Sequence, residues 1–160
     1  ITRDQMEQSA QQFQKQKQVE EDMQAKQQAR QNVIQGEKFL AKNAKQPSVH
    51  VLPNGLQYKI LTPGVGTHPT NTDQVTVNYT GRLINGEVFD SSYKRGQPIT
   101  LPMAGVIPGW REALKLMQPG AMWELYIPAK LAYGERGMPP VIGQNQTLIF
   151  KVQLLSIQGK

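Results

Sequence analysis

The chain has 160 residues, with 18 Lys and Arg against 12 Asp and Glu, a formal net charge of +6 and no cysteine. This length fits one globular domain with an appendage, and the absence of cysteine excludes disulfides, thiol catalysis and cysteine-ligated zinc. No apolar run approaches the ~20 residues of a membrane span. The basic residues are interspersed with acidic ones, so nucleic acid, which needs a concentrated basic face, is not an expected partner.

The first 46 residues differ in texture from the rest of the chain. They contain no Pro, one Gly and thirteen Gln, and they end just before Pro47, which disfavours helical backbone at Gln46. Gln-rich segments can also be disordered. The Ala, Lys, Glu and Arg content, and pairs such as Asp22 and Lys26 four residues apart, favour a helix. A helix over this whole segment would be roughly 60 Å long.

The apolar residues of this segment lie near its two ends and leave a polar middle. One group is Met6, Ala10 and Phe13, and the other is Val33, Ile34, Phe39 and Leu40. No heptad pattern is sustained over three turns, which favours a spacer helix over a coiled coil. The face with Met6 and Phe13 needs a partner, and no nearby segment is an obvious one.

From Pro47 onward, short apolar runs alternate with turns. Alternation of apolar and polar residues predicts four strands and one short helix: Leu56–Ile60, Gln74–Ile84, Met122–Ile127 and Thr147–Ile157, with a helix over Trp110–Met117. Asn85-Gly86 is a strong turn signal. Strands with one helix predict an α+β domain, an antiparallel sheet with the helix across one face.

The most specific pattern is a set of aromatic and apolar motifs in fixed order. They are YTGRLINGEVFDSS at 79–92, VIPGW at 106–110, LAYG at 131–134 and LIF at 148–150. Aromatic residues outnumber titratable ones, which indicates a site for an apolar group that works without a nucleophile. Taken singly, Tyr79, Phe89 or Phe150 would be assigned to a core, and Asp90 to a turn or helix cap. The ordered combination is what carries the functional interpretation.

In order and spacing, these motifs resemble the FKBP-type peptidyl-prolyl isomerases, with the best fit to the Mip-like bacterial branch. The resemblance covers residues 47–160 at motif level and residues 1–46 in architecture only. It implies an antiparallel half-barrel sheet wrapped around one short helix, with 1–46 as a long helical linker and 47–160 as the isomerase domain. The chain begins at Ile1 without an initiator Met, so we expect a processed or truncated product.

Mip-like proteins also carry an upstream segment that forms an intertwined dimer, from which the long helix projects. The resemblance therefore implies a homodimer in the full-length protein, through the region at and before this helix. We expect most of that dimerisation region to precede Ile1, and this chain to be monomeric or weakly associating.

The resemblance also assigns a pocket for a proline ring. Trp110 would form its floor, and its walls and rim would be Tyr79, Phe89, Val106, Ile107, Phe150 and Ile142. The Ile107 N–H would hold the substrate carbonyl next to the proline, and the Tyr133 hydroxyl would bind substrate backbone. Asp90, oriented by Tyr79 and Arg95, would polarise the pocket edge. The catalytic candidates are Asp90, Tyr133, Ile107, Trp110 and Phe89.

Two positions depart from the family pattern. Ile99 follows Gln97-Pro98, where many members place an aromatic wall residue, and Met138 stands where a His is common. Ile99 keeps the wall apolar but removes an edge-on ring contact, so we expect altered macrolide affinity with catalysis retained. Met138 removes a polar contact with substrate.

The sequence indicates neither a metal site nor a cofactor. His50 and His68 are isolated, with no carboxylate or second His at ligand spacing. Ser91 and Ser92 have no His within motif reach, which argues against a hydrolase triad.

Three functions stay open on the sequence. The leading one is a peptidyl-prolyl isomerase acting on unfolded or proline-containing protein chains and inhibited by rapamycin-type macrolides. The second is a chaperone or peptide-binding module with incidental turnover, and the third is a virulence-associated surface protein. By resemblance, the expected location is the periplasm or the outer membrane and cell surface of a Gram-negative bacterium.

Overall fold

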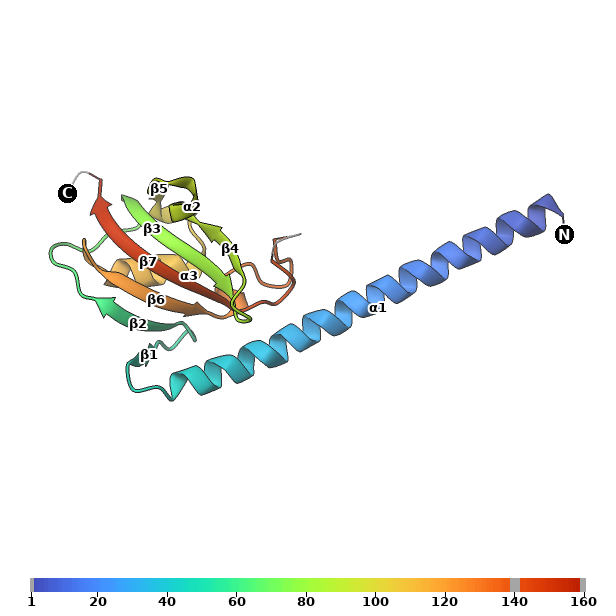
Figure 1. The fold of residues 1–160 in the computed structure, drawn as a ribbon, viewed down its shortest axis with the longest axis horizontal. Coiled ribbons are helices and arrows are strands. Elements are labelled where there is room, and N and C mark those ends of the chain that lie inside the picture. The colour runs from blue at the N-terminus through green and yellow to red at the C-terminus, as the bar shows by residue number, and fades with distance from the viewer. Residues whose placement is uncertain (1, 139–141, 159–160) are drawn as a thin grey trace.

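A long helix precedes a small sheet domain and extends well beyond it (Figure 1). The architecture comes from a computed structural model, which describes residues 2–138 and 142–158. Helix α1 spans Arg3–Ala44, 42 residues or roughly 63 Å. Thr2 begins it with a capping box, because its hydroxyl accepts from the Gln5 N–H while the Gln5 side chain accepts from the Thr2 N–H. The predicted N-terminal helix is thus confirmed.

Within the described residues, the sheet has seven antiparallel strands. They are β1 Val49–Val51, β2 Gln57–Thr62, β3 Gln74–Leu83, β4 Val88–Ser91, β5 Ile99–Pro102, β6 Met122–Ile127 and β7 Leu148–Ile157. Their order is β1-β2-β6-β7-β3-β4, and β5 also pairs with β3. Strand β4 pairs with the second half of β3 and β5 with its first half, so the two share one edge. The short helix α2, Ser92–Arg95, projects between them.

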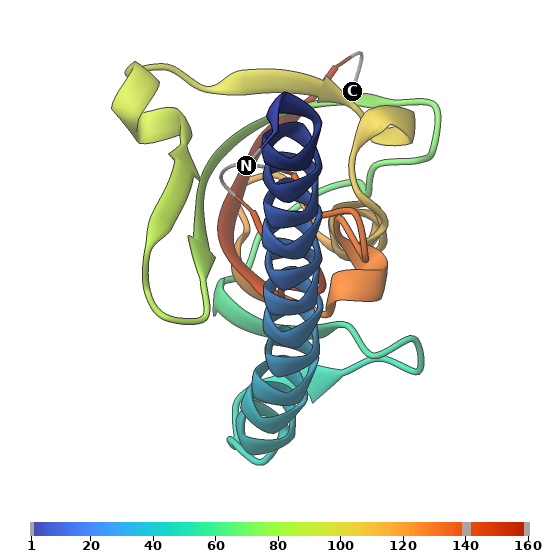
Figure 2. The same ribbon diagram turned by 90° about the vertical axis from the view of Figure 1, so that its right-hand side faces the viewer.

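Helix α3, Pro108–Leu116, lies in the concave side of the curved sheet (Figures 1 and 2). Pro108 occupies its first turn, where a missing N–H costs nothing. Ala113 and Leu114 of this helix are fully buried against the inward residues of the central strands, such as Val77 and Leu125. The alternation of buried and half-buried residues along β3 is the period-two pattern of a sheet with one face on the core. The predicted α+β half-barrel is confirmed.

The C-terminal third of α1 packs on the sheet domain through polar side chains and through the ring of Phe39, whose centroid lies 6.0 Å from that of Tyr126. The Asn43 amide donates to Gln57 Oε1 at 2.9 Å, and the Gln57 amide donates to the Leu40 carbonyl at 2.9 Å. Asn32 donates to the Gln144 carbonyl at 2.8 Å. At Gly36 an added Cβ would lie 2.4 Å from Thr147 Oγ1, so only glycine permits this approach.

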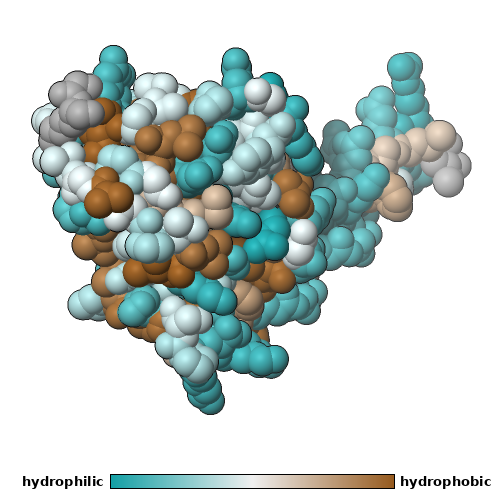
Figure 3. Space-filling model, turned by 60° about the vertical axis from the view of Figure 1, so that its left-hand side comes forward, coloured by the Kyte–Doolittle hydropathy of each residue, from teal (hydrophilic) through white to brown (hydrophobic). Residues whose placement is uncertain are grey.

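The N-terminal part of α1 stands away from the domain and is hydrophilic apart from a few side chains (Figures 1 and 3). Met6 and Phe13, on one face as the sequence indicates, are 62% and 68% exposed. Among the described residues, no helix combines the length and apolarity needed to cross a membrane.

Candidate functional site

A cavity of about 270 Å³ opens between α3, the β3–β4–β5 edge and the segment before β7. Its wall is mostly apolar, with one carboxylate and two tyrosines. The lining residues are Tyr79, Phe89, Asp90, Ile99, Leu101, Gly105, Val106, Ile107, Trp110, Tyr133 and Phe150.

The aromatic rings of the cavity pack edge to face around Trp110. The centroid of Trp110 lies 5.1 Å from that of Tyr79 and 5.2 Å from that of Phe150, with interplanar angles of 79° and 90°. Phe89 meets Phe150 at 5.5 Å and 90°. Such perpendicular pairs are a favoured arrangement of aromatic quadrupoles, so the rings hold one another in place. Trp110 is 4% exposed, and its indole N–H is buried without a hydrogen-bond partner among the described residues.

Gly81 is what allows the two phenylalanines to meet. It lies on β3, opposite Asp90 of β4 and Phe150 of β7. An added Cβ would come within 2.7 Å of ring atoms of both Phe89 and Phe150. The glycine of the YTGR motif therefore makes room for the wall.

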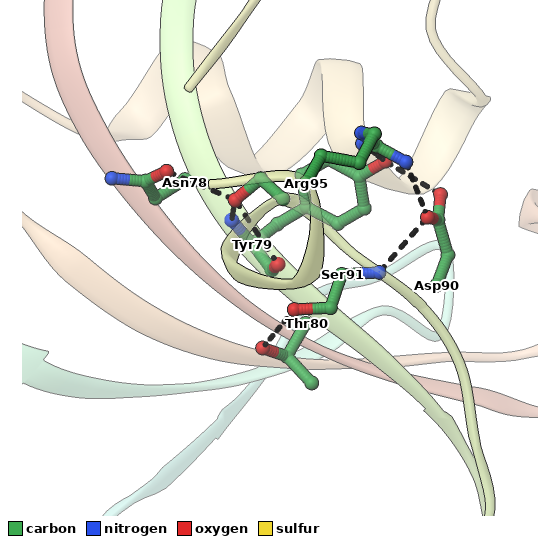
Figure 4. A network of polar contacts seen from close by, with 7 residues as sticks. Asn78, Tyr79, Thr80, Asp90, Ser91 and Arg95 are labelled. Atoms are coloured by element: carbon green, nitrogen blue, oxygen red, sulfur yellow. Dashed lines mark hydrogen bonds and ion pairs between the residues drawn. The ribbon is translucent and has the colours of Figure 1, made fainter. Parts of the chain in front are cut away.

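Asp90 at the cavity edge is held by a polar network (Figure 4). The Tyr79 hydroxyl donates to Asp90 Oδ2 at 2.5 Å, and Arg95 donates to Asp90 Oδ1 at 2.8 Å and to the Tyr79 hydroxyl at 2.7 Å. The Ser91 N–H also donates to the carboxylate, at 2.9 Å. The Ser92 hydroxyl accepts a hydrogen bond from the Tyr79 N–H, which ties the start of α2 to β3.

These contacts shift the pKa values of the cavity's titratable groups away from neutrality. Burial opposes ionisation of Asp90, but the hydrogen bonds from Tyr79 and Arg95 and the Arg95 charge outweigh it and hold the pKa of the carboxyl below its ordinary value. Burial raises the pKa of Tyr79, and the hydrogen bond to Asp90 adds to the rise. Burial, then the Asp90 charge, raises the pKa of Tyr133. At neutral pH the site therefore presents one fixed carboxylate and two protonated phenols, with no proton donor or acceptor poised near pH 7.

Besides the buried indole N–H of Trp110, two hydrogen-bond donors of the cavity have no acceptor among the described residues. Ile107 is the N-cap residue of α3, with extended backbone, and its N–H makes no hydrogen bond to any described residue. The Tyr133 hydroxyl likewise has no partner in the described part of the chain. Its backbone is fixed from both sides, because the Gly134 N–H donates to the Ala129 carbonyl and the Asn145 N–H to the Gly134 carbonyl. Both donors are available to a bound chain.

The structure gathers most of the sequence-predicted residues into the lining of this cavity, with two exceptions, Ile142 and Arg95. Ile142, expected at the rim, is outside the lining and only 2% exposed, because it faces the core and pairs with Met138 in an isolated bridge. Arg95 lies behind the wall and reaches the site through Asp90 and Tyr79. Residues 139–141 of the loop between Gly134 and Gln146 lie outside the described residues.

Two lining residues, Leu101 and Gly105, escaped the sequence interpretation. Leu101 lies two residues after Ile99 and therefore on the same face of the strand. The expected place of Ile99 in the wall could have indicated that Leu101 lines the cavity too. No comparable signal marks Gly105.

The fold and the cavity match the expectation from the sequence, a curved antiparallel sheet around helix α3 with an aromatic cup, formed by the lining residues above, at one edge. A family model described as FKBP-type peptidyl-prolyl cis-trans isomerase matches residues 66–155, and one described as the domain amino terminal to it matches residues 1–60. The chain belongs to the FKBP-type peptidyl-prolyl cis-trans isomerase family. The resemblance noted in the sequence is confirmed.

Two relatives indicate the branch. The chain is 60% identical over 129 residues to the peptidyl-prolyl cis-trans isomerase Mip of Coxiella burnetii, a match covering 81% of this chain and 56% of that protein. It is 46% identical over 158 residues to the outer membrane protein MIP of Legionella longbeachae, covering 99% of this chain and 68% of that one. The chain thus spans between about half and two thirds of these relatives.

Solved structures agree in fold. The crystal structure of FkpA from Escherichia coli superposes with a TM-score of 0.92 at 38% identity, covering 98% of this chain and 73% of that one. A peptidyl-prolyl cis-trans isomerase from Pseudomonas syringae superposes with a TM-score of 0.75 at 35% identity, covering 80% of this chain and 94% of that one.

Proposed function

We propose that the protein is a peptidyl-prolyl cis-trans isomerase that accelerates rotation about Xaa-Pro bonds in protein chains. The observation that carries this proposal is the cup itself, a cavity of about 270 Å³ floored by a buried indole and walled by apolar and aromatic side chains. A proline ring is an apolar group of suitable size for such a cup. The membership of the chain in the isomerase family supports the same activity.

The electrostatics of the cavity suit this reaction. Uncatalysed Xaa-Pro isomerisation takes ~10–100 s because the twisting amide loses its resonance. The twisted amide is less polar than the planar one, so an apolar cavity that excludes water favours it, and neither an acid nor a base is required. A thousandfold acceleration needs only ~4 kcal/mol of differential stabilisation, which a few apolar contacts and hydrogen bonds can provide. The fixed carboxylate and protonated phenols fit a mechanism without proton transfer.

The proposed roles are those that the family resemblance implies, and the geometry of the lining supports them. Trp110 supports the proline ring, and the rings of Tyr79, Phe89 and Phe150 enclose it together with Val106 and Ile107. The unpaired Ile107 N–H binds the substrate carbonyl next to the proline, and the Tyr133 hydroxyl binds substrate backbone. Asp90, fixed by Tyr79 and Arg95, gives the cavity edge its polarity. A rapamycin-type macrolide occupies the same cup in this proposal.

A groove of about 490 Å³ between α1 and the sheet domain favours a second candidate function, chaperone or peptide-binding activity with incidental turnover. Its lining includes apolar residues of both parts, such as Leu40, Val51 and Pro128. The exposed Met6 and Phe13 support dimerisation of the full-length protein through the region at and before α1. The name of the Legionella relative supports a location at the outer membrane, with the periplasm and a virulence role as the further expectations.

The test is the rate of cis-to-trans isomerisation of a short Xaa-Pro peptide, with and without rapamycin. Tyr133→Phe removes one hydrogen bond in a partly desolvated site and lowers kcat/KM by roughly three- to tenfold. Tyr93→Phe is the matched control, because Tyr93 is exposed on α2 and outside the cavity lining, and it leaves kcat/KM unchanged. Asp90→Ala removes the carboxylate and also lowers kcat/KM.

Catalysis that rapamycin suppresses and that Tyr133→Phe weakens supports the isomerase and its site. A folded protein that fails to catalyse but still binds unfolded chains would refute the proposal and favour the chaperone.

A further inference from the structure

Arg111, on the second turn of α3, holds the segment that forms one wall of the cup. Its guanidinium donates to three backbone carbonyls of this segment, those of Met103, Ala104 and Val106. The Nε–Met103 O distance is 3.3 Å, and Nη2 lies 3.3 Å from Ala104 O and 3.2 Å from Val106 O. The Arg111 backbone N–H also donates to the Ile107 carbonyl at 3.1 Å. Four of the five carbonyls between residues 103 and 107 are therefore held by this one residue.

No other hydrogen bond or ion pair of the Arg111 side chain occurs among the described residues. Arg111 forms no ion pair with any carboxylate in the described ranges, where Arg3, Arg82 and Arg95 do. A cation close to the N-terminus of a helix gains nothing from the helix dipole, whose positive end lies there. The guanidinium is directed instead at the loop of the short helix η1, Met103–Gly105, a loop that no strand pairing fixes.

The contact with Val106 matters most, because its carbonyl belongs to the same peptide group as the Ile107 N–H. A trans peptide is planar, with its C=O and N–H directed oppositely. Fixing the Val106 carbonyl on Arg111 therefore also fixes the direction of the Ile107 N–H, which lies in the same peptide plane and points away from the guanidinium. A hydrogen bond to the carbonyl also polarises the peptide group and strengthens the N–H as a donor. Val106 and Ile107 both line the cup, and this N–H is unpaired.

We propose that Arg111 is a positioning residue for the isomerase site, which orients and polarises the 106–107 peptide group so that the Ile107 N–H binds the substrate carbonyl. The inference rests on the proposed function, since it assigns that N–H to substrate. Among the described residues, the side-chain hydrogen bonds of Arg111 all go to backbone carbonyls of the protein itself.

The kinetic test compares wild type, Arg111→Met, Arg111→Lys and Lys115→Met in the short-peptide assay. Arg111→Met keeps an unbranched apolar stem and removes the charge and all three side-chain bonds. It raises KM about fivefold, the equivalent of one ordinary hydrogen bond, with little change in kcat, because the carbonyl is held in both ground and transition states. Arg111→Lys keeps the charge but lacks the planar fork and falls between wild type and Arg111→Met. Lys115→Met, one turn further along α3, removes the same charge away from the loop and behaves as wild type.

The second readout needs no turnover. In isotope-labelled protein, the Val106 carbonyl carbon and the Ile107 amide proton report the peptide group directly by NMR. Both resonances move in Arg111→Met, and the shift of the Ile107 amide proton on saturation with rapamycin is smaller than in wild type. Lys115→Met leaves both unchanged.

The outcomes separate the two proposals. An active wild type with unchanged KM in folded Arg111→Met, or with a loss confined to kcat, overturns the role of Arg111 and leaves the isomerase proposal standing. Unchanged Val106 and Ile107 resonances in Arg111→Met or Arg111→Lys overturn it whether or not the protein is an isomerase. A folded wild type without catalysis overturns the proposed function. If the Ile107 amide resonance of that protein also does not shift on addition of rapamycin, this inference is overturned as well.

Discussion

Replacing Gly81 with alanine tests whether the Phe89–Phe150 wall serves catalysis. The new Cβ would lie 2.7 Å from both rings. Carbon atoms attract at ~3.5–4.0 Å, so each ring must retreat by about 1 Å. Overpacking of this kind costs ~1–3 kcal/mol. Phe89 is only half-buried and can move toward the cavity. We therefore expect the free energy of unfolding to fall by ~1–2 kcal/mol and the Tm by roughly 3–8 °C.

The same retreat narrows the cup, so activity falls together with stability. We expect kcat/KM for a short Xaa-Pro peptide to drop at least about tenfold, which corresponds to ~1.4 kcal/mol of lost transition-state stabilisation. Gly143→Ala is the matched control, because its Cβ meets first the flexible amide end of Gln146, at 3.3 Å, and it leaves both quantities near wild type. A variant with lower Tm but wild-type kcat/KM would refute the role of these rings in the site.

Three further changes test the floor, the carboxylate and the α1 contact. Trp110→Ala should cost ~3–5 kcal/mol in denaturant unfolding and reduce kcat/KM at least about tenfold, and near-normal activity in the folded variant would contradict its place under the proline. Since the pKa of Asp90 is depressed by folding, its contribution to stability is complete above its unfolded pKa of ~3.9 and is lost as pH falls through the lower folded value. The stability difference between wild type and Asp90→Asn should therefore be constant above about pH 5 and shrink below about pH 4, and a difference that grows on acidification would refute the pKa direction. Gly36→Val should push α1 off Thr147 and expose the helix to limited proteolysis, while short-peptide kcat/KM stays within about twofold because the cup is a separate site.

The sheet and helices were accessible to sequence reasoning because local patterns dictate them. Strand β3 alternates buried and half-buried residues along its whole length, so its period was visible, and its predicted end at Ile84 differs from Leu83 by one residue. Helix α1 was predicted from its composition and from Pro47, and it ends at Ala44, two residues before the predicted end. Strands β1, β4 and β5, with three or four residues each, and the four-residue α2 are too short to show a period and were not predicted.

The site residues that belong to the ordered motifs could be predicted. Residues whose position depends on tertiary packing could not. The contact of Asp90 with Tyr79 and Arg95 followed from the resemblance and exists in the structure. Ile142 lies in the core and outside the cavity lining. An apolar loop residue can face either one, and the sequence looks the same in both cases. The attachment of α1 was missed because it depends on Asn32 and Asn43, whose polar side chains suggest solvent. Their burial is tolerated only because each amide finds a partner across 112 and 14 residues of sequence.

The small size of that attachment has a mechanical consequence. From Ala29, whose carbonyl accepts from the Asn145 amide, back to Arg3, α1 runs for roughly 39 Å at ~1.5 Å per residue. A tilt of about 10° at the attachment therefore moves the far end by about 7 Å, more than the height of one helical turn. The contacts of Asn32, Gly36 and Asn43 thus set the direction of the helix, and a small rotation there becomes a large displacement of its N-terminal end.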